Sequence, residues 1–255
     1  MSFRRLSRRT VLMLTILIVF FLPVFVRAAL FAAGDAPRSW RDADWSSTSM
    51  LPPAHADKNA RVVVFTGTAG AWKGVVAVHS WIVFKRENAT RWTRYDVVGW
   101  GNPVRTNNWP VDGRWYGNAP RIIADISAVE AEQLIPRIET AVNAYTYAQA
   151  GDYSVWPGPN SNSFIAAILR AVPELGTLPP NAIGRDYRPG FYAGLTDSRT
   201  GIELNANGFA SLKIGWVEGI EMNLLGLVAG LDLRNPALKL PGFGRIGVSV
   251  AAAVQ

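Results

Sequence analysis

The chain has 255 residues, 49% of them hydrophobic and 18% charged, so it can bury a core of its own and is not a disordered sequence. The formal net charge of +7 owes much to five arginines near the N-terminus, namely Arg4, Arg5, Arg8, Arg9 and Arg27. Without these five, 21 of the 26 basic residues stand against 19 acidic ones. A body so close to neutral is not expected to bind nucleic acid, which requires a concentrated basic face.

A basic segment followed by an apolar run begins the chain. Arg8 and Arg9 precede apolar residues 11–26, which only Thr15 and Pro23 interrupt. This pattern is typical of a secretory signal or a signal anchor, and the string Ser-Arg-Arg-x-x-Leu also resembles a twin-arginine export signal. We predict that residues 1–33 form a signal anchor or transmembrane helix. Residues 10–33 would then lie in the bacterial inner membrane as a single pass, with the bulk of the chain in the periplasm. Cleavage is the alternative.

Four strand signals and two helix signals follow a proline-containing linker or wrapping segment at residues 34–60. The strands are predicted at residues 61–66, 74–84, 91–100 and 121–126, and the helices at residues 127–149 and 164–172. This order predicts an α+β domain over residues 61–200, with an antiparallel sheet packed with helices. Residues 201–255 are rich in glycine and predict an extension packed on that domain, in which the pattern leaves helix and strand open.

The segment Trp-Pro-Gly-Pro-Asn-Ser-Asn-Ser-Phe at residues 156–164 looks like a catalytic turn without its nucleophilic cysteine, and the chain has no cysteine. Ser161 stands three residues before Phe164, and His79 lies on an earlier strand. This order resembles the circularly permuted branch of the papain-like superfamily, which includes cell-wall peptidases and lecithin-retinol-type acyltransferases. The resemblance implies a permuted papain-like fold for the domain, with serine in place of cysteine.

Three further strings resemble an uncharacterised bacterial envelope family, the domain-of-unknown-function family numbered 3750. They are His-Ser-Trp, Gly-Pro-Asn-Ser-Asn and Gly-Arg-Asp-Tyr-Arg-Pro-Gly, and the resemblance covers roughly residues 61–200. That family supplies no function.

A catalytic role would require His79 as base and Ser161 as nucleophile, because a hydroxyl must lose its proton during attack. A third group must orient the imidazole, and Asp96 or Asn102 is the candidate. The backbone amides of residues 162 and 163 are candidates for an oxyanion hole. The alternative is structural: asparagine and serine at residues 160–163 are preferred helix caps, and a histidine in an apolar strand is commonly held by a neighbour.

Other residues are candidates for ligand binding because they combine aromatic faces with amide or guanidinium donors. These are Trp81, Asn102, Trp109, Trp115, Asn160, Asn162 and Arg185. The loop at residues 101–120 could instead pack its own aromatic side chains, and Arg185 could pair with Asp186. Two histidines and no cysteine make a zinc site improbable, and no cofactor is expected.

Three functions remain open from the sequence. The first is a degenerate, non-hydrolytic cleft that binds a peptide or acyl amide of the envelope. The second is an active Ser/His amidase or acyltransferase. The third is a structural or assembly protein whose residues 201–255 contact a partner in the membrane. The expected partner is thus the inner membrane, together with an envelope peptide, glycan or lipid.

Overall fold

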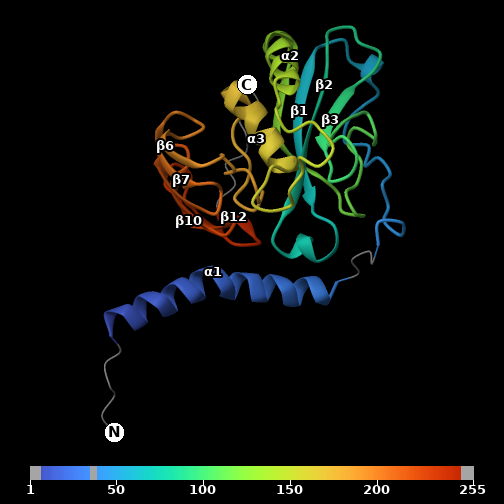
Figure 1. Ribbon diagram of the computed structural model, residues 1–255. Coiled ribbons are helices and arrows are strands. Elements are labelled where there is room, and N and C mark those ends of the chain that lie inside the picture. Colours follow the sequence, from blue (N-terminus) through green and yellow to red (C-terminus); the bar gives the residue numbers. More distant parts are fainter. Residues whose placement is uncertain (1–6, 35–38, 248–255) are drawn as a thin grey trace.

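The computed structural model describes residues 7–34 and 39–247. Within these residues the chain forms an α+β structure with two antiparallel sheets and three α-helices, which confirms the predicted class. The first helix, α1 (Arg8–Ala32), runs along one side of the body that holds both sheets (Figure 1). By length and composition α1 is able to cross a membrane, although a signal sequence meets the same criteria.

The first sheet has five strands in the order β4-β3-β2-β1-β5, and every neighbouring pair is antiparallel. In chain order the strands are β1 (Arg61–Thr68), β2 (Val78–Lys85), β3 (Thr93–Val97), β4 (Val104–Thr106) and β5 (Arg121–Ser127). The strands β1 and β2 are buried on both faces, as their continuous apolar sequences predict. Strand β2 begins later than predicted, because the 3-10 helix η2 (Ala71–Val75) occupies the residues before it.

Two helices, α2 (Ala128–Asn143) and α3 (Ser161–Ala171), pack on one face of this sheet and close the main core, and the 3-10 helix η3 (Pro173–Leu175) follows α3. The buried stripe of α2 includes Leu134, Ile138 and Val142, at the predicted spacing. The prediction that this helix continues to residue 149 was wrong. The chain leaves the helix after Asn143, and the Tyr145 ring packs edge-on against Phe164 of α3.

The opposite face of the first sheet is covered by tryptophans from two separate segments. Trp40 and Trp45, from the region predicted as a linker, pack against Trp115 of the loop after β4. Residues 46–51 run alongside the same loop: Ser47 forms an isolated β-bridge with Gly113, and Leu51 is buried. The 3-10 helix η1 (Ala54–Ala56) then precedes β1. Residues 34–60 were predicted as a linker or a wrapping segment, and their described part wraps around the first sheet.

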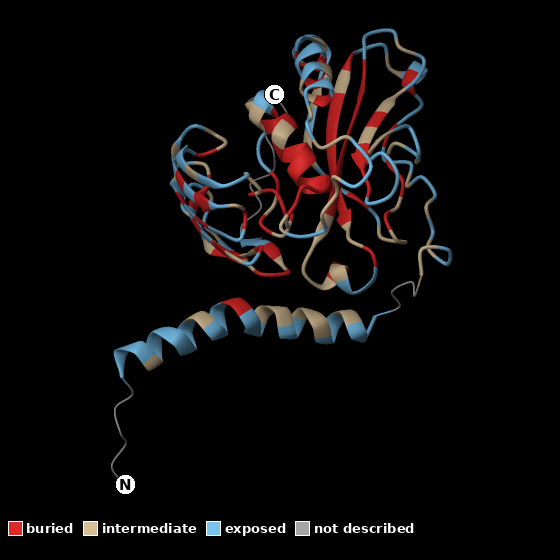
Figure 2. Ribbon diagram, in the orientation of Figure 1, coloured by how far each residue is buried: buried red, intermediate tan, exposed pale blue. Residues whose placement is uncertain are grey.

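The region that the sequence left open between helix and strand is a second sheet of seven antiparallel strands in chain order. Its strands are β6 (Phe191–Leu195), β7 (Gly201–Ala206), β8 (Ala210–Gly215), β9 (Gly219–Leu224), β10 (Leu227–Asp232), β11 (Ala237–Leu240) and β12 (Gly244–Gly247). Buried and exposed residues alternate along β7, β8 and β9, in contrast to the uniformly buried β1 and β2 (Figure 2). The sheet begins at Phe191, ahead of the boundary that the sequence suggested at residue 200.

Candidate functional site

The first turn of α3 is capped by its own sequence. The side-chain Oδ1 of Asn160 accepts hydrogen bonds from the backbone N–H groups of Asn162 (2.9 Å) and Ser163 (3.1 Å). In return, the Ser163 hydroxyl accepts from the N–H of Asn160 at 2.6 Å. Both amides predicted to form an oxyanion hole are therefore occupied, and that prediction was wrong because the asparagine cap reaches them first. Ser161 takes no part in the cap through its side chain.

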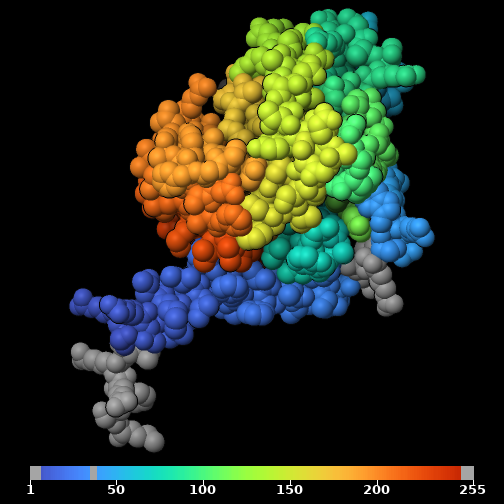
Figure 3. All heavy atoms as spheres, in the orientation of Figure 1, coloured from blue at the N-terminus to red at the C-terminus, as the bar shows by residue number. Residues whose placement is uncertain are grey.

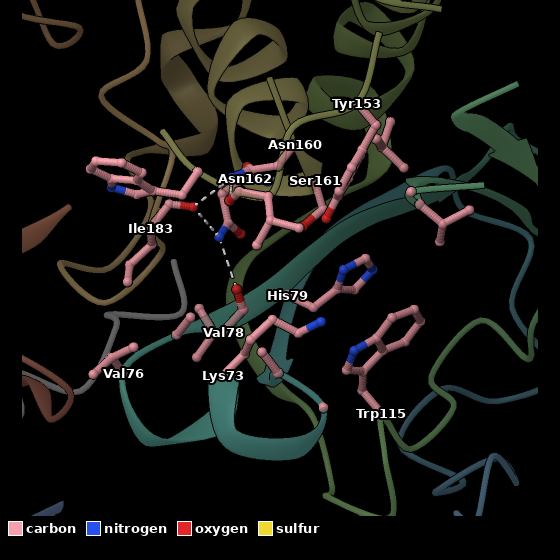
Figure 4. Close-up of a pocket in the computed structure, with 18 of the residues that line it drawn as sticks. Lys73, Val76, Val78, His79, Trp115, Tyr153, Asn160, Ser161, Asn162 and Ile183 are labelled. Carbon is pink, nitrogen blue, oxygen red and sulfur yellow. Dashed lines mark hydrogen bonds between the residues drawn. The ribbon is translucent and has the colours of Figure 1, made fainter. Parts of the chain in front are cut away.

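Asn162 fixes the start of α3 against β2. Its side-chain oxygen accepts a hydrogen bond of 2.6 Å from the Ser80 hydroxyl. Its amide nitrogen donates to the backbone carbonyls of Val78 and Ile183, both at 2.8 Å (Figure 4). All of these groups are polar and enclosed, so each bond satisfies a group that burial would otherwise penalise. Asn162 is thus a positioning residue that holds Ser161 beside the strand that bears His79.

His79 is held between an aromatic face and a carboxylate. Its ring stacks on Trp115 with centroids 3.6 Å apart and planes within 2° of parallel. Its Nε2 lies 3.7 Å from Oδ1 of Asp96, beyond hydrogen-bond length, and both atoms are buried without a hydrogen-bond partner. Burial lowers the pKa of His79, while Asp96 opposes that change. The imidazole is therefore neutral at neutral pH, the form that a general base requires.

Asp96 also forms a buried ion pair that the sequence analysis missed. Its Oδ2 accepts a 2.9 Å hydrogen bond from Nε of Arg94, two residues earlier on β3. The guanidinium lies over the Trp81 ring, 4.4 Å from its centroid, and donates to the carbonyl of Pro110 at 2.5 Å. Two charged residues at spacing i, i+2 share one face of a strand, and this was the signal available in the sequence. The ion pair fixes Asp96 behind His79.

A cavity of about 390 Å³ lies in front of His79 and the start of α3. The side chains of His79, Ser161, Asn160 and Asn162 form its polar end. The remaining wall is mostly apolar and aromatic, and includes Val78, Val97, Tyr153, Ile183, Leu227 and Trp115. The lining side chains that are exposed to solvent mark the mouth of the cavity, and they are Trp72, Trp100, Val155, Trp156 and Leu225.

The lining residues contain one lysine and no arginine, carboxylate or second histidine. This residue, Lys73, comes from η2, and Figure 4 draws its side chain extending into the space beside Trp115. Among the described residues Lys73 forms no ion pair and no side-chain hydrogen bond, and the Ser161 hydroxyl likewise has no hydrogen-bond partner. The side chains of Ser161 and His79, both among the described residues, are not hydrogen-bonded to each other. The sequence analysis missed Lys73, which stands just before the strand predicted at residues 74–84.

The structure brings six of the ten sequence-predicted site residues together. His79, Ser161, Trp115, Asn160 and Asn162 line the cavity, and Asp96 lies directly behind His79. The others lie elsewhere, and they are Trp81, Asn102, Trp109 and Arg185. The two tryptophans belong to the aromatic cluster behind the sheet, and Asn102 is exposed in the loop before β4.

Arg185 is buried among charged residues of the second sheet. It forms ion pairs with Glu221 and, at 3.5 Å, with Asp186, so it serves the internal pairing that the sequence left as the alternative to ligand binding. No group of three histidine or carboxylate side chains in the described residues is placed to hold a metal ion.

A family model described as a protein of unknown function, DUF3750, matches residues 59–187, just over half of the chain. The chain belongs to the DUF3750 family. The match begins at β1, ends after the Arg185-Asp186 pair, and includes every residue of the polar end of the cavity. Helix α1 and the second sheet lie outside the matched DUF3750 region. Neither a curated protein nor a solved structure matches the chain.

Proposed function

We propose that this DUF3750 protein binds an acyl-amide ligand of the bacterial envelope in the cavity between β2 and α3. The ligand's apolar part contacts the aromatic wall, and its amide meets Ser161 and His79. The chain is held at the inner membrane by α1, with the body in the periplasm. The domain is a permuted papain-like domain with a serine at the cysteine position, as the order of the His79 strand and the Ser161 helix suggests.

The observation that supports this proposal is the composition of one cavity. Its volume of about 390 Å³ lies within the usual range for small-molecule sites, roughly 300–1,000 Å³. Polar groups gather at one end, and the rest of the wall is mostly apolar and aromatic. A ligand with a polar head and an apolar chain matches that division, because each part then meets a surface of its own kind.

Lys73 adds a requirement for the ligand's charge. Its ammonium group lines the cavity and has no anionic partner among the described residues. A ligand carboxylate or phosphate near the amide would supply that partner. We therefore expect an N-acylated amino acid or peptide to bind better than the corresponding neutral amide.

Calorimetric titration of the full chain in lipid nanodiscs tests the proposal with two probes, N-decanoylglycine and its primary amide. We expect both to bind, the acid more tightly. Lys73→Glu should weaken binding of the acid about tenfold and change binding of the amide much less. Lys58→Glu, an exposed residue remote from the cavity lining, is the matched control. Equal affinity of wild type and Lys73→Glu for the acid, or no binding of either probe, would refute the proposal.

A second candidate is a Ser/His amidase or acyltransferase acting on the same ligand. Two observations favour it: the Asp96 carboxylate lies beside Nε2 of His79, and His79 and Ser161 line the same cavity. In that reaction His79 accepts the hydroxyl proton as the Ser161 oxygen attacks the carbonyl. His79 then gives the proton to the leaving amine, and water releases the acyl group from Ser161.

Labelling of the full chain with a fluorophosphonate separates the two candidates. A catalytic serine should react in the wild type and in the control Ser154→Ala, and should not react in Ser161→Ala. Labelling that persists in Ser161→Ala contradicts the catalytic role. An unlabelled wild type that still binds N-decanoylglycine leaves the binding function alone.

A further inference from the structure

The second sheet presents a row of apolar side chains that crosses all seven strands. Consecutive cross-strand partners form this row, which consists of Leu195, Ile202, Ile214, Ile220, Leu231, Leu238 and Ile246. Each of them is between 40% and 61% exposed. A parallel row runs through Ala193, Leu204, Leu212, Met222 and Ala229. Within β6–β12 no charged side chain occupies a position in register with these rows.

The opposite face of the same sheet carries the charges, and it faces the body of the protein. Glu203, Lys213 and Glu221 are cross-strand partners there, and all three are buried. Lys213 binds Asp186 at 2.6 Å, and Lys239 binds Glu221 at 2.5 Å. An antiparallel sheet with one solvated face normally buries its apolar side chains and exposes its polar ones. This sheet does the reverse, and the paired charges hold it in that orientation.

Helix α1 adjoins this apolar face. It contacts β10, β11 and η2, and Phe20 of α1 is completely buried. At the edge of the sheet, the Arg27 side-chain carbons lie close to Gly242, where a Cβ would be 3.3 Å away. Figure 3 shows α1 lying against the C-terminal strands and against the loop that contains η2. The apolar helix and the apolar sheet face are therefore neighbours on one side of the molecule.

The rim of the face carries an aromatic residue and cations. The turns after β6, β8 and β10 lie at the same end of the meander, and they present Arg199, Trp216 and Arg234. All three are exposed, Trp216 by 63%. Among the described residues neither arginine forms an ion pair. Tryptophan and arginine beside an apolar surface are the residues that the headgroup region of a membrane favours.

We propose that the outer face of β6–β12 rests on the lipid bilayer, with its apolar rows at the level of the acyl chains. Arg199 and Arg234 contact anionic headgroups. The occupant is lipid rather than a second copy because the face adjoins a helix that is able to enter a membrane, and because its rim complements anionic lipid. A contiguous apolar patch of this extent requires a cover, and the bilayer supplies one without a further protein.

Single-cysteine labelling tests this directly, because the chain has no native cysteine. The full chain carrying Leu212→Cys or Ile202→Cys is labelled with the environment-sensitive dye NBD and reconstituted into phosphatidylethanolamine–phosphatidylglycerol vesicles. Glu130→Cys, on the exposed surface of α2, is the matched control. We expect blue-shifted emission and at least about twofold quenching by doxyl-labelled lipid at both sheet positions. The control position should respond instead to aqueous iodide.

Two outcomes overturn the proposal. One is iodide access at the sheet positions equal to that of the control. The other is a blue-shifted dye that doxyl lipid leaves unquenched, together with disulfide cross-linking between unlabelled Leu212→Cys chains, which assigns the face to a second copy. Comparison with vesicles of phosphatidylcholine alone, which carry no net charge, tests whether the rim arginines bind anionic headgroups. Arg199→Glu with Arg234→Glu should reduce doxyl quenching in the anionic vesicles and leave it unchanged in the neutral ones.

Discussion

Replacing Lys213 by methionine should destabilise the protein, because it removes the main cation from a buried carboxylate. The Nζ of Lys213 donates a 2.6 Å hydrogen bond to Oδ1 of Asp186 and lies 4.0 Å from a carboxylate oxygen of Glu203. Burial alone would raise the pKa of Asp186, but Lys213 and Arg185 together bring that pKa from 3.8 to about 2. A difference of this size corresponds to about 2 kcal/mol of stability at neutral pH.

The methionine variant retains the volume of the lysine stem and leaves the two carboxylates with less positive charge nearby. Breaking one partner of a buried pair typically costs about 3–5 kcal/mol. We expect a loss of about 3 kcal/mol at pH 7, because Arg185 still faces Asp186. The folded-state pKa of Asp186 is depressed, so its stabilising contribution is complete above its ordinary pKa and is lost as the pH falls toward 2. In Lys213→Met that acid dependence should shrink.

Urea unfolding of the full chain in a mild detergent, followed by far-ultraviolet circular dichroism at pH 7 and pH 3, measures both effects. Lys58→Met, an exposed lysine, is the control and should lie within about 0.5 kcal/mol of wild type. The double variant Lys213→Met with Asp186→Asn should recover part of the loss, since it removes a buried charge. A Lys213→Met protein as stable as the control at pH 7, or one with the acid dependence of the wild type, would refute the reasoning.

Three further perturbations follow from the site. Burial lowers the pKa of His79, so its neutral form stabilises the fold above the ordinary pKa of 6.5. That contribution is lost as the pH falls below 6.5. His79→Gln should therefore flatten the decline of the urea midpoint below pH 6.5. Gly184→Ala places a Cβ 2.2 Å from the Asn160 side-chain amide at a positive φ, so it should lower the free energy of unfolding by about 2 kcal/mol. Gly176→Ala is the control: its φ is also positive but the space around it is open, so it should cost about 1 kcal/mol. Asn162→Ala leaves the Ser80 hydroxyl and two backbone carbonyls without their hydrogen-bond partner. The free energy of unfolding in the same assay should fall by about 2–3 kcal/mol. A change below about 1 kcal/mol would contradict the positioning role.

The first sheet could be predicted from the sequence because burial on both faces leaves a continuous apolar run. The strands β1 and β2 are such runs, and β2 is the middle strand of the five. The first residue of β2 was missed because a 3-10 helix of alanine, tryptophan, lysine, glycine and valine has no periodicity that separates it from a strand end. Helix α2 was predicted too long, because tertiary packing of Tyr145 on Phe164 ends it.

The second sheet was not predicted because turn glycines divide the alternating pattern into short pieces. The strings Ile-Glu-Leu-Asn in β7 and Ile-Glu-Met-Asn in β9 do alternate with a period of two. Alternation gives a strand two unlike faces, but it does not state which face points inward. The cationic partners of Glu203 and Glu221 decide that the charged face is inside. These partners are Arg185, Arg188, Lys213 and Lys239.

In the candidate site, too, some residues could be predicted from local sequence patterns, whereas others depend on contacts made only in the folded chain. The pairing of His79 with Ser161 followed from a motif and an element order, and the structure places both on one cavity. Asp96 was a candidate by proximity along the hairpin, and it lies behind His79. Arg94 and Lys73 were not found, because their roles depend on which charges and which space they meet after folding.

The two proposals meet at the mouth of the cavity. Trp72 lies at the mouth and belongs to η2, which contacts α1. Leu225 also lies at the mouth, in the turn between β9 and β10 of the sheet whose outer face is apolar. With α1 and that face in the bilayer, the mouth lies close to the headgroups. An acylated ligand could then pass from the membrane into the cavity without exposing its chain to water, which favours a lipid-borne ligand over a soluble peptide.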